Sequence, residues 1–113
     1  MIHHTTREIP PDTRDACVSF YEQLGFQTVD PPPGIAGRAL WLEAARGDQR
    51  TQIHLMPVEG ATPAAGHVAV ICRDYDAHVG DGPSSPRSFV HDPAGNLVEL
   101  MAWPPGDDGP SPT

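Results

Sequence analysis

The sequence contains no lysine, few aromatic residues and no long apolar run. Its seven arginines are outnumbered by 15 aspartates and glutamates, which gives a formal net charge of -8. A nucleic-acid partner is therefore not expected, because it would require a basic surface. No segment is apolar enough to span a bilayer or to resemble a signal peptide, so we expect a soluble, cytoplasmic protein without a membrane partner. The acidic balance permits a cationic small-molecule partner but does not require one.

Cysteine is also scarce, and the two that occur, Cys17 and Cys72, form no C-x-x-C pair. A thiolate zinc site is therefore not expected, and both side chains are interpreted as small buried hydrophobes. Only 38% of the residues are apolar, whereas 14 are proline and 11 are glycine. This composition predicts short elements joined by many turns, and 113 residues are enough for one domain.

Apolar periodicity and turn residues predict a mixed α+β fold. Asp12 is placed to cap a helix in which Ala16, Phe20 and Leu24 recur every four residues, and Gly25 is expected to end it. A second helix is expected to start at 74 and to be stopped at once by glycine and proline. The predicted strands cover 2–9, 26–29, 39–45, 51–56, 67–72, 87–90 and 97–103.

The two halves of the chain resemble each other. Each half opens on a strand that begins with histidine, at His4 and at His67, and the closing strands share one pattern around His54 and Glu99. The second half is shorter by about one helix. We expect one domain over 1–104, built from modules 1–59 and 66–104 with a small-residue linker between them, and a disordered tail over 105–113.

Strand alternation makes the four residues His4, His54, His67 and Glu99 candidates for one metal site. Residues i and i+2 share a face of a strand, so the four side chains meet if the two halves wrap into one curved sheet. Imidazole and carboxylate together suit a single divalent Zn, Ni, Co, Mn or Fe ion. Taken singly, residues such as His54 and His67 are more often hydrogen-bonded core histidines than metal ligands, and His3 and His4 could simply be solvated. The repeat favours the metal-ligand interpretation.

The sequence resembles the vicinal-oxygen-chelate superfamily, which includes glyoxalase I, bleomycin-resistance proteins and extradiol dioxygenases. The resemblance spans residues 2 to 103. It depends on stretches that occur together in one order: His3-His4, Phe20-Tyr21-Glu22-Gln23-Leu24-Gly25-Phe26, Gln52-Ile53-His54-Leu55, Gly66-His67-Val68-Ala69-Val70 and Phe89-Val90-His91-Asp92-Pro93-Ala94-Gly95-Asn96-Leu97-Val98-Glu99-Leu100.

The resemblance implies two βαβββ modules that curl into an incomplete barrel around the metal, and a homodimer. It implies metal ligands at His4, His54, His67 and Glu99, with His4 preferred over His3. This sequence departs from the family pattern in the second module, where the segment between Tyr75 and Arg87 has no room for most of the usual helix and the strand after it. A shortened second module argues against a bulky, tightly enclosed substrate.

The first functional hypothesis is an enzyme, a metal-dependent lyase or isomerase of glyoxalase type that acts on a small oxygenated substrate. Glu99 is then both a metal ligand and the catalytic base, and Glu8 is a second candidate acid or base. The expected substrate-binding residues are arginines that could hold a carboxylate or phosphate and apolar residues that could line the pocket: Arg38, Trp41, Arg87, Met101 and Trp103. The arginines are equally typical of an exposed surface, and Trp41 and Met101 of a core.

Two other functions remain open. A non-catalytic antibiotic-binding or resistance protein fits the acidic charge, but it does not need the intact ligand set. An extradiol-type dioxygenase normally uses two histidines and one carboxylate, so a fourth protein ligand at His54 would crowd the positions for oxygen and substrate.

Overall fold

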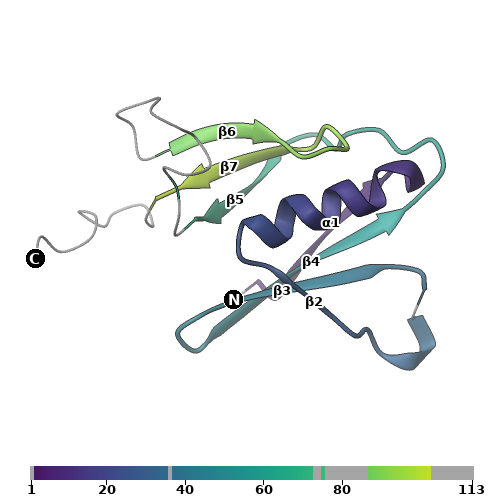
Figure 1. Ribbon diagram of the computed structural model, residues 1–113, viewed down its shortest axis with the longest axis horizontal. Helices are drawn as coiled ribbons and strands as arrows, with labels where there is room; N and C mark the ends of the chain where they lie inside the picture. Colours follow the sequence, from purple (N-terminus) through teal and green to yellow (C-terminus); the bar gives the residue numbers. More distant parts are fainter. Residues whose placement is uncertain (1, 36, 73–74, 76–86, 103–113) are drawn as a thin grey trace, which may run out of the picture.

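The computed structural model describes residues 2–35, 37–72, 75 and 87–102. They form a four-stranded sheet of order β1-β4-β3-β2 and a three-stranded sheet of order β5-β7-β6. Figure 1 shows the two sheets as separate, unclosed layers with α1 between them in this view. In chain order the elements are β1 (His4–Ile9), the 3-10 turn η1 (Pro11–Thr13), α1 (Arg14–Gln23), β2 (Gln27–Val29), the 3-10 turn η2 (Pro33–Ile35), β3 (Leu40–Arg46), β4 (Gln49–Pro57), β5 (His67–Ile71), β6 (Arg87–His91) and β7 (Leu97–Met101).

The two sheets share one arrangement of their opening and closing strands. β1 pairs in parallel with β4, and β5 pairs in parallel with β7. The closing strand of each sheet also pairs antiparallel with the strand before it, β3 in the first sheet and β6 in the second. The predicted α+β class and the predicted pair of related, incomplete sheets are therefore confirmed.

One hydrophobic core joins the two sheets. From the first sheet it contains Ile9, Leu42 and Leu55, which share the face that α1 covers, and from the second it contains Val98 and Leu100. The helix contributes Cys17 and Tyr21, both fully buried. Since α1 packs against both sheets, the opposite face of each sheet is left to carry polar side chains, and those faces hold the candidate site.

The start of the helix differs from the prediction. Asp12 does not cap it, because Pro10 and Pro11 lead into the 3-10 turn η1 and α1 begins only at Arg14. The Thr13 hydroxyl donates to the Pro10 carbonyl oxygen at 2.7 Å, which closes that turn. The predicted end is confirmed: Gly25 follows the helix with φ +104, a conformation that glycine adopts without steric cost.

The sequence Asp92-Pro-Ala-Gly-Asn forms a tight turn before β7. Asp92 Oδ1 accepts hydrogen bonds from the backbone N–H groups of Ala94 and Asn96, each at 2.9 Å. Gly95 has φ +90, and a β-carbon there would lie 2.9 Å from Pro63 Cγ. This motif of the resemblance therefore has a structural role in this chain, since it fixes the turn and its packing against the linker.

Two predictions concern segments that the structure does not describe. The shortened helix after 74 and the tail at 105–113 both lie outside the described residues. Within the described part of the chain, no helix is long and apolar enough to cross a membrane.

Candidate functional site

The imidazole of His54 is held between two other rings on the polar face of the first sheet. Trp41 is its register partner on β3, and their rings stack at 4.2 Å with an interplanar angle of 5°. His4 stacks on the other side at 4.1 Å and 13°. The His54 residue is only 7% exposed. Stacking of this kind fixes the plane of the His54 ring. The two ring nitrogens lie at the edge of the stack, where they can form hydrogen bonds.

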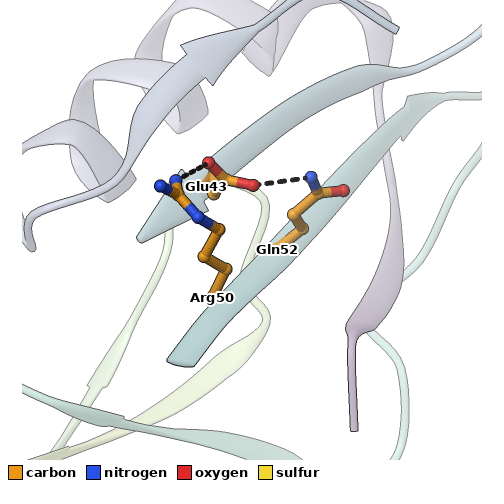
Figure 2. A network of polar contacts seen from close by, with 3 residues as sticks. All are labelled: Glu43, Arg50 and Gln52. Atoms are coloured by element: carbon orange, nitrogen blue, oxygen red, sulfur yellow. Dashed lines mark hydrogen bonds and ion pairs between the residues drawn. The ribbon is translucent and has the colours of Figure 1, made fainter. Parts of the chain in front are cut away.

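A chain of polar contacts then fixes which nitrogen of His54 carries the proton. His54 Nε2 lies 2.7 Å from Gln52 Oε1, and Gln52 Nε2 donates to Glu43 Oε1 at 3.1 Å. Figure 2 shows Glu43 between Gln52 and Arg50, whose Nη1 lies 3.0 Å from Glu43 Oε2. A carboxylate only accepts hydrogen bonds, so the Gln52 amide must turn its NH₂ toward Glu43 and its oxygen toward His54. In the neutral imidazole, Nε2 is therefore the donor and Nδ1 keeps the lone pair.

The charges of Glu43 and His54 follow from these polar contacts and from burial. The hydrogen bond from Gln52, followed by Arg50, lowers the pKa of Glu43, so this carboxyl group is ionised at neutral pH. Burial, followed by the neighbouring His4 and His3, lowers the pKa of His54. His54 is therefore neutral at neutral pH and offers a lone pair.

A second pair lies on the open face of the second sheet. His67 Nε2 lies 3.1 Å from Glu99 Oε1, and Arg87 Nε lies 3.6 Å from Glu99 Oε2. The Glu99 residue is only 9% exposed, so its carboxylate needs these partners. The ring of Phe89, which is the register partner of Glu99 on β6, meets the His67 ring edge-on at 5.4 Å.

The two pairs occupy equivalent places in the two sheets. His4 faces Gln52 in the register of β1 and β4, and His54 lies two residues further along β4. His67 faces Leu97 in the register of β5 and β7, and Glu99 lies two residues further along β7. The sequence repeat is thus reproduced in the strand pairing, with His54 and Glu99 at equivalent register positions.

The four predicted metal ligands come together two by two. His4 meets His54 on the first sheet and His67 meets Glu99 on the second, and the described residues contain no group of three or more His, Cys, Asp or Glu side chains able to hold one metal ion. The chemistry of the donors suits a divalent transition metal. Their arrangement within one chain does not bring all four to a common point.

Two recesses adjoin these pairs. The larger, the inter-sheet cleft, has a volume of about 1070 Å³ and runs between the edge strands β1 and β5, with His4 and His67 among its lining residues. The smaller, the Trp41 pocket, has a volume of about 390 Å³ and is lined by His4, His54, Trp41 and Arg38, among others. His4 lines both recesses. A ligand in either recess would therefore contact a residue of the predicted site.

The remaining predicted site residues have different positions. Glu8, the second candidate acid or base, is exposed, lies opposite Met56 in register and lines neither recess. Arg87 is committed to Glu99, and Met101 is buried on the same strand as Glu99 without lining a recess. Trp103 lies outside the described residues.

Sequence reasoning missed the residues that hold the pairs in place. Gln52, Glu43 and Arg50 were not singled out, although Gln52 shares a strand face with His54 and that spacing is a usable signal. Two arginines of the inter-sheet cleft, Arg7 and Arg46, were also missed, because nothing local in the sequence indicates that they line the same recess as β5.

Comparisons with known proteins bear on the fold. No protein-family model matches the sequence, and no curated protein matches it. Among solved structures, a protein assigned to the glyoxalase family from Bacillus anthracis has 23% identity and a TM-score of 0.69, over 89% of this chain and 93% of that chain.

Two further solved structures agree. A member of the glyoxalase/bleomycin resistance protein/dioxygenase superfamily from Sphaerobacter thermophilus has 20% identity and a TM-score of 0.53, over 89% of this chain and 95% of that chain. A bleomycin resistance determinant encoded on the transposon Tn5 has 24% identity and a TM-score of 0.52, over 86% of this chain and 94% of that chain. The chain therefore has the vicinal-oxygen-chelate fold of the glyoxalase/bleomycin resistance/dioxygenase superfamily.

Proposed function

We propose that this protein binds a small organic molecule in the inter-sheet cleft. The observation that carries the proposal is the cleft itself: at about 1070 Å³ it is at the upper end of the size of small-molecule sites, and the opening strands of both sheets line it. One protein of the same fold is named as a bleomycin resistance determinant, which supports a small-molecule ligand. The resistance-type binder is the simplest form of the proposal.

A catalytic form of the same proposal is a metal-dependent lyase or isomerase of glyoxalase type. The specific observation in its favour is that His4 and His67, one from each half, line the same cleft, with Glu99 3.1 Å from His67. A divalent metal would supply Lewis-acid polarisation of a substrate oxygen. The donors lie in two pairs, and Glu99 is proposed as the group that accepts a proton from the substrate.

The metal content of the purified protein tests the catalytic form. We expect about one equivalent of a first-row divalent metal per chain in the wild type, and loss of that metal in His54→Ala and in Glu99→Ala. His91→Ala is the matched control, because His91 is an exposed histidine on β6 that lines neither recess. A wild-type protein that neither carries nor takes up metal would eliminate the catalytic form and leave the binder.

Activity measurements separate the remaining alternatives. Formation of lactoylglutathione from the hemithioacetal of methylglyoxal would identify the glyoxalase reaction, and oxygen consumption with catechols would identify the dioxygenase. Calorimetric titration with bleomycin tests the resistance-type binder directly.

We further propose that the protein is a homodimer in the cytoplasm, as expected for a small member of this fold. Light scattering coupled to size-exclusion chromatography should give about twice the chain mass of 12.1 kDa. A mass of one chain at micromolar concentration would contradict the dimer.

A further inference from the structure

We propose that the ligand of the inter-sheet cleft is an organic anion, a carboxylate or a phosphate ester with a small apolar body. The inference rests on the proposed function and names the chemical class of its ligand. The guanidinium and imidazole side chains that line the cleft come from three arginines and two histidines, Arg7, Arg46, Arg50, His4 and His67, and no aspartate or glutamate is among its described lining residues.

This lining is the reverse of the overall composition. Acidic residues outnumber arginines by 15 to 7 in the chain, so a recess whose described lining holds three arginines and no carboxylate differs from the average composition. A concave site lined by one sign of charge focuses its electrostatic potential into the recess and raises the local concentration of the opposite charge. The cleft should therefore attract anions although the protein as a whole is acidic.

Among the residues that the structure describes, the charges of the cleft arginines are only partly compensated. Arg50 forms an ion pair with Glu43 at 3.0 Å. None of the ion pairs between described residues involves Arg7 or Arg46. At physiological ionic strength the Debye length is about 8 Å, so distant carboxylates are largely screened and the charges of the cleft itself decide what binds there.

The Trp41 pocket continues the same pattern. Its polar lining includes Arg38 and three histidines, among them His4, which also lines the cleft, and no carboxylate is among its described lining residues. Glu8 lies further along β1, opposite Met56, and is not part of this lining. An anion that extends past His4 therefore meets the guanidinium of Arg38, and none of the described lining residues there is a repelling carboxylate.

The rest of the cleft lining is suited to the body of the ligand. Leu24, Phe26 and Val70 are apolar residues of this lining. β1 and β5 are edge strands, hydrogen-bonded to a neighbour on one side only within the described sheets, so backbone N–H groups on their free edges are further donors for an anion. Together these features fit a ligand with an anionic head group and an apolar body.

A set of matched probes tests the charge preference. Benzoate, benzamide and benzamidine have nearly the same size and differ in charge, and phenyl phosphate separates a preference for phosphate from one for carboxylate. Each probe is titrated into the ¹⁵N-labelled protein, and amide shifts of β1 and β5 are followed by NMR. We expect benzoate or phenyl phosphate to bind at least about tenfold more tightly than benzamidine, with benzamide between them and with shifts confined to the cleft.

Three variants assign the preference to the cleft. Arg46→Gln, at an exposed position of β3, should weaken anion binding several-fold and leave benzamide binding unchanged, and Arg7→Gln should do the same from β1. Arg14→Gln is the control, because Arg14 is exposed on α1 and lines neither recess. An Arg7 variant that fails to fold leaves the Arg46 variant to decide.

The outcomes distinguish the inference from the proposed function. Tighter binding of benzamidine than of benzoate, or an anion affinity that Arg46→Gln does not change, overturns the anion preference and leaves a small-molecule cleft. If none of the four probes shifts the amides of β1 and β5, the proposed function fails together with the inference.

Discussion

The Tyr21 hydroxyl donates a 2.7 Å hydrogen bond to Asp92 Oδ2, and this contact joins the helix of the first half to the turn that precedes the last strand. Tyr21 is 1% exposed and Asp92 is 3% exposed. Asp92 also accepts hydrogen bonds from Asn96, so its charge is held by several donors at once. The position of Glu99 on the strand that follows depends on this turn.

Replacing Tyr21 with phenylalanine should therefore destabilise the protein. The substitution removes one hydrogen bond to a charged acceptor in the interior, which costs about 1.5–3 kcal/mol. Urea denaturation should show a lower midpoint with an unchanged slope. Ser19→Ala, on the exposed side of the same helix, is the control and should change the free energy of unfolding by less than about 0.5 kcal/mol. Equal midpoints for Tyr21→Phe and the wild type would contradict this role.

The buried hydroxyl of Tyr21 should make the folded state less stable at alkaline pH. Burial and then the hydrogen bond to Asp92 raise the pKa of Tyr21 above its ordinary value. The folded state thus favours the protonated phenol, so its stabilising effect is complete below about pH 10, the pKa of an unfolded tyrosine, and is lost as the pH rises beyond it. Urea midpoints measured on both sides of that pH should fall more for the wild type than for Tyr21→Phe. Parallel curves would show that Tyr21 does not contribute.

Gly95 should tolerate alanine less well than another glycine with a similar backbone. Gly95→Ala places a β-carbon at φ +90 and 2.9 Å from Pro63 Cγ, whereas Gly60→Ala places one at φ +77 with nothing within 4 Å. Both variants pay about 1–2 kcal/mol for the left-handed conformation. Only Gly95→Ala adds the contact with Pro63, so its unfolding midpoint should be the lower of the two. The reverse order would show that the linker moves away without cost.

Gln52 should control the tautomer of His54. Gln52→Leu removes the acceptor of the Nε2 proton and leaves a buried imidazole nitrogen without its partner, which costs about 1–3 kcal/mol. Long-range ¹H–¹⁵N correlation spectra should show His54 as the Nε2–H form in the wild type and as a mixture in Gln52→Leu. Gln49→Leu, at an exposed position of the same strand, should leave the His54 signals unchanged. A single Nε2–H form in both variants would remove Gln52 from this role.

Local patterns in the sequence predict most of the fold. Alternation locates the strands to within about two residues, and Gly25 marks the end of α1 because only glycine adopts φ +104 without strain. Asp12 was misread because a polar residue before an apolar repeat is typical of an N-cap. The two preceding prolines start a 3-10 turn instead, which moves the first helical residue to Arg14.

The sequence predicts which site residues share a face of one sheet, but not how the two sheets are placed relative to each other. The face shared by His54 and Gln52, and that shared by His67 and Ala69, follow from alternation along one strand. The separation between the first pair and the second depends on how two sheets pack around α1, and no short sequence pattern specifies that packing. The composition also obscured the charge of the cleft, because net charge says nothing about which residues line a recess.

The matching register of the two pairs makes each half a template for redesigning the other. His54 and Glu99 occupy equivalent positions in two sheets with the same strand arrangement. A metal-donor side chain introduced at one position therefore has a defined counterpart at the other. A library that exchanges residues between these two positions would sample new donor sets on an unchanged pair of strands. Such exchanges would show how far the two sheets differ in the side chains that they accept at equivalent positions.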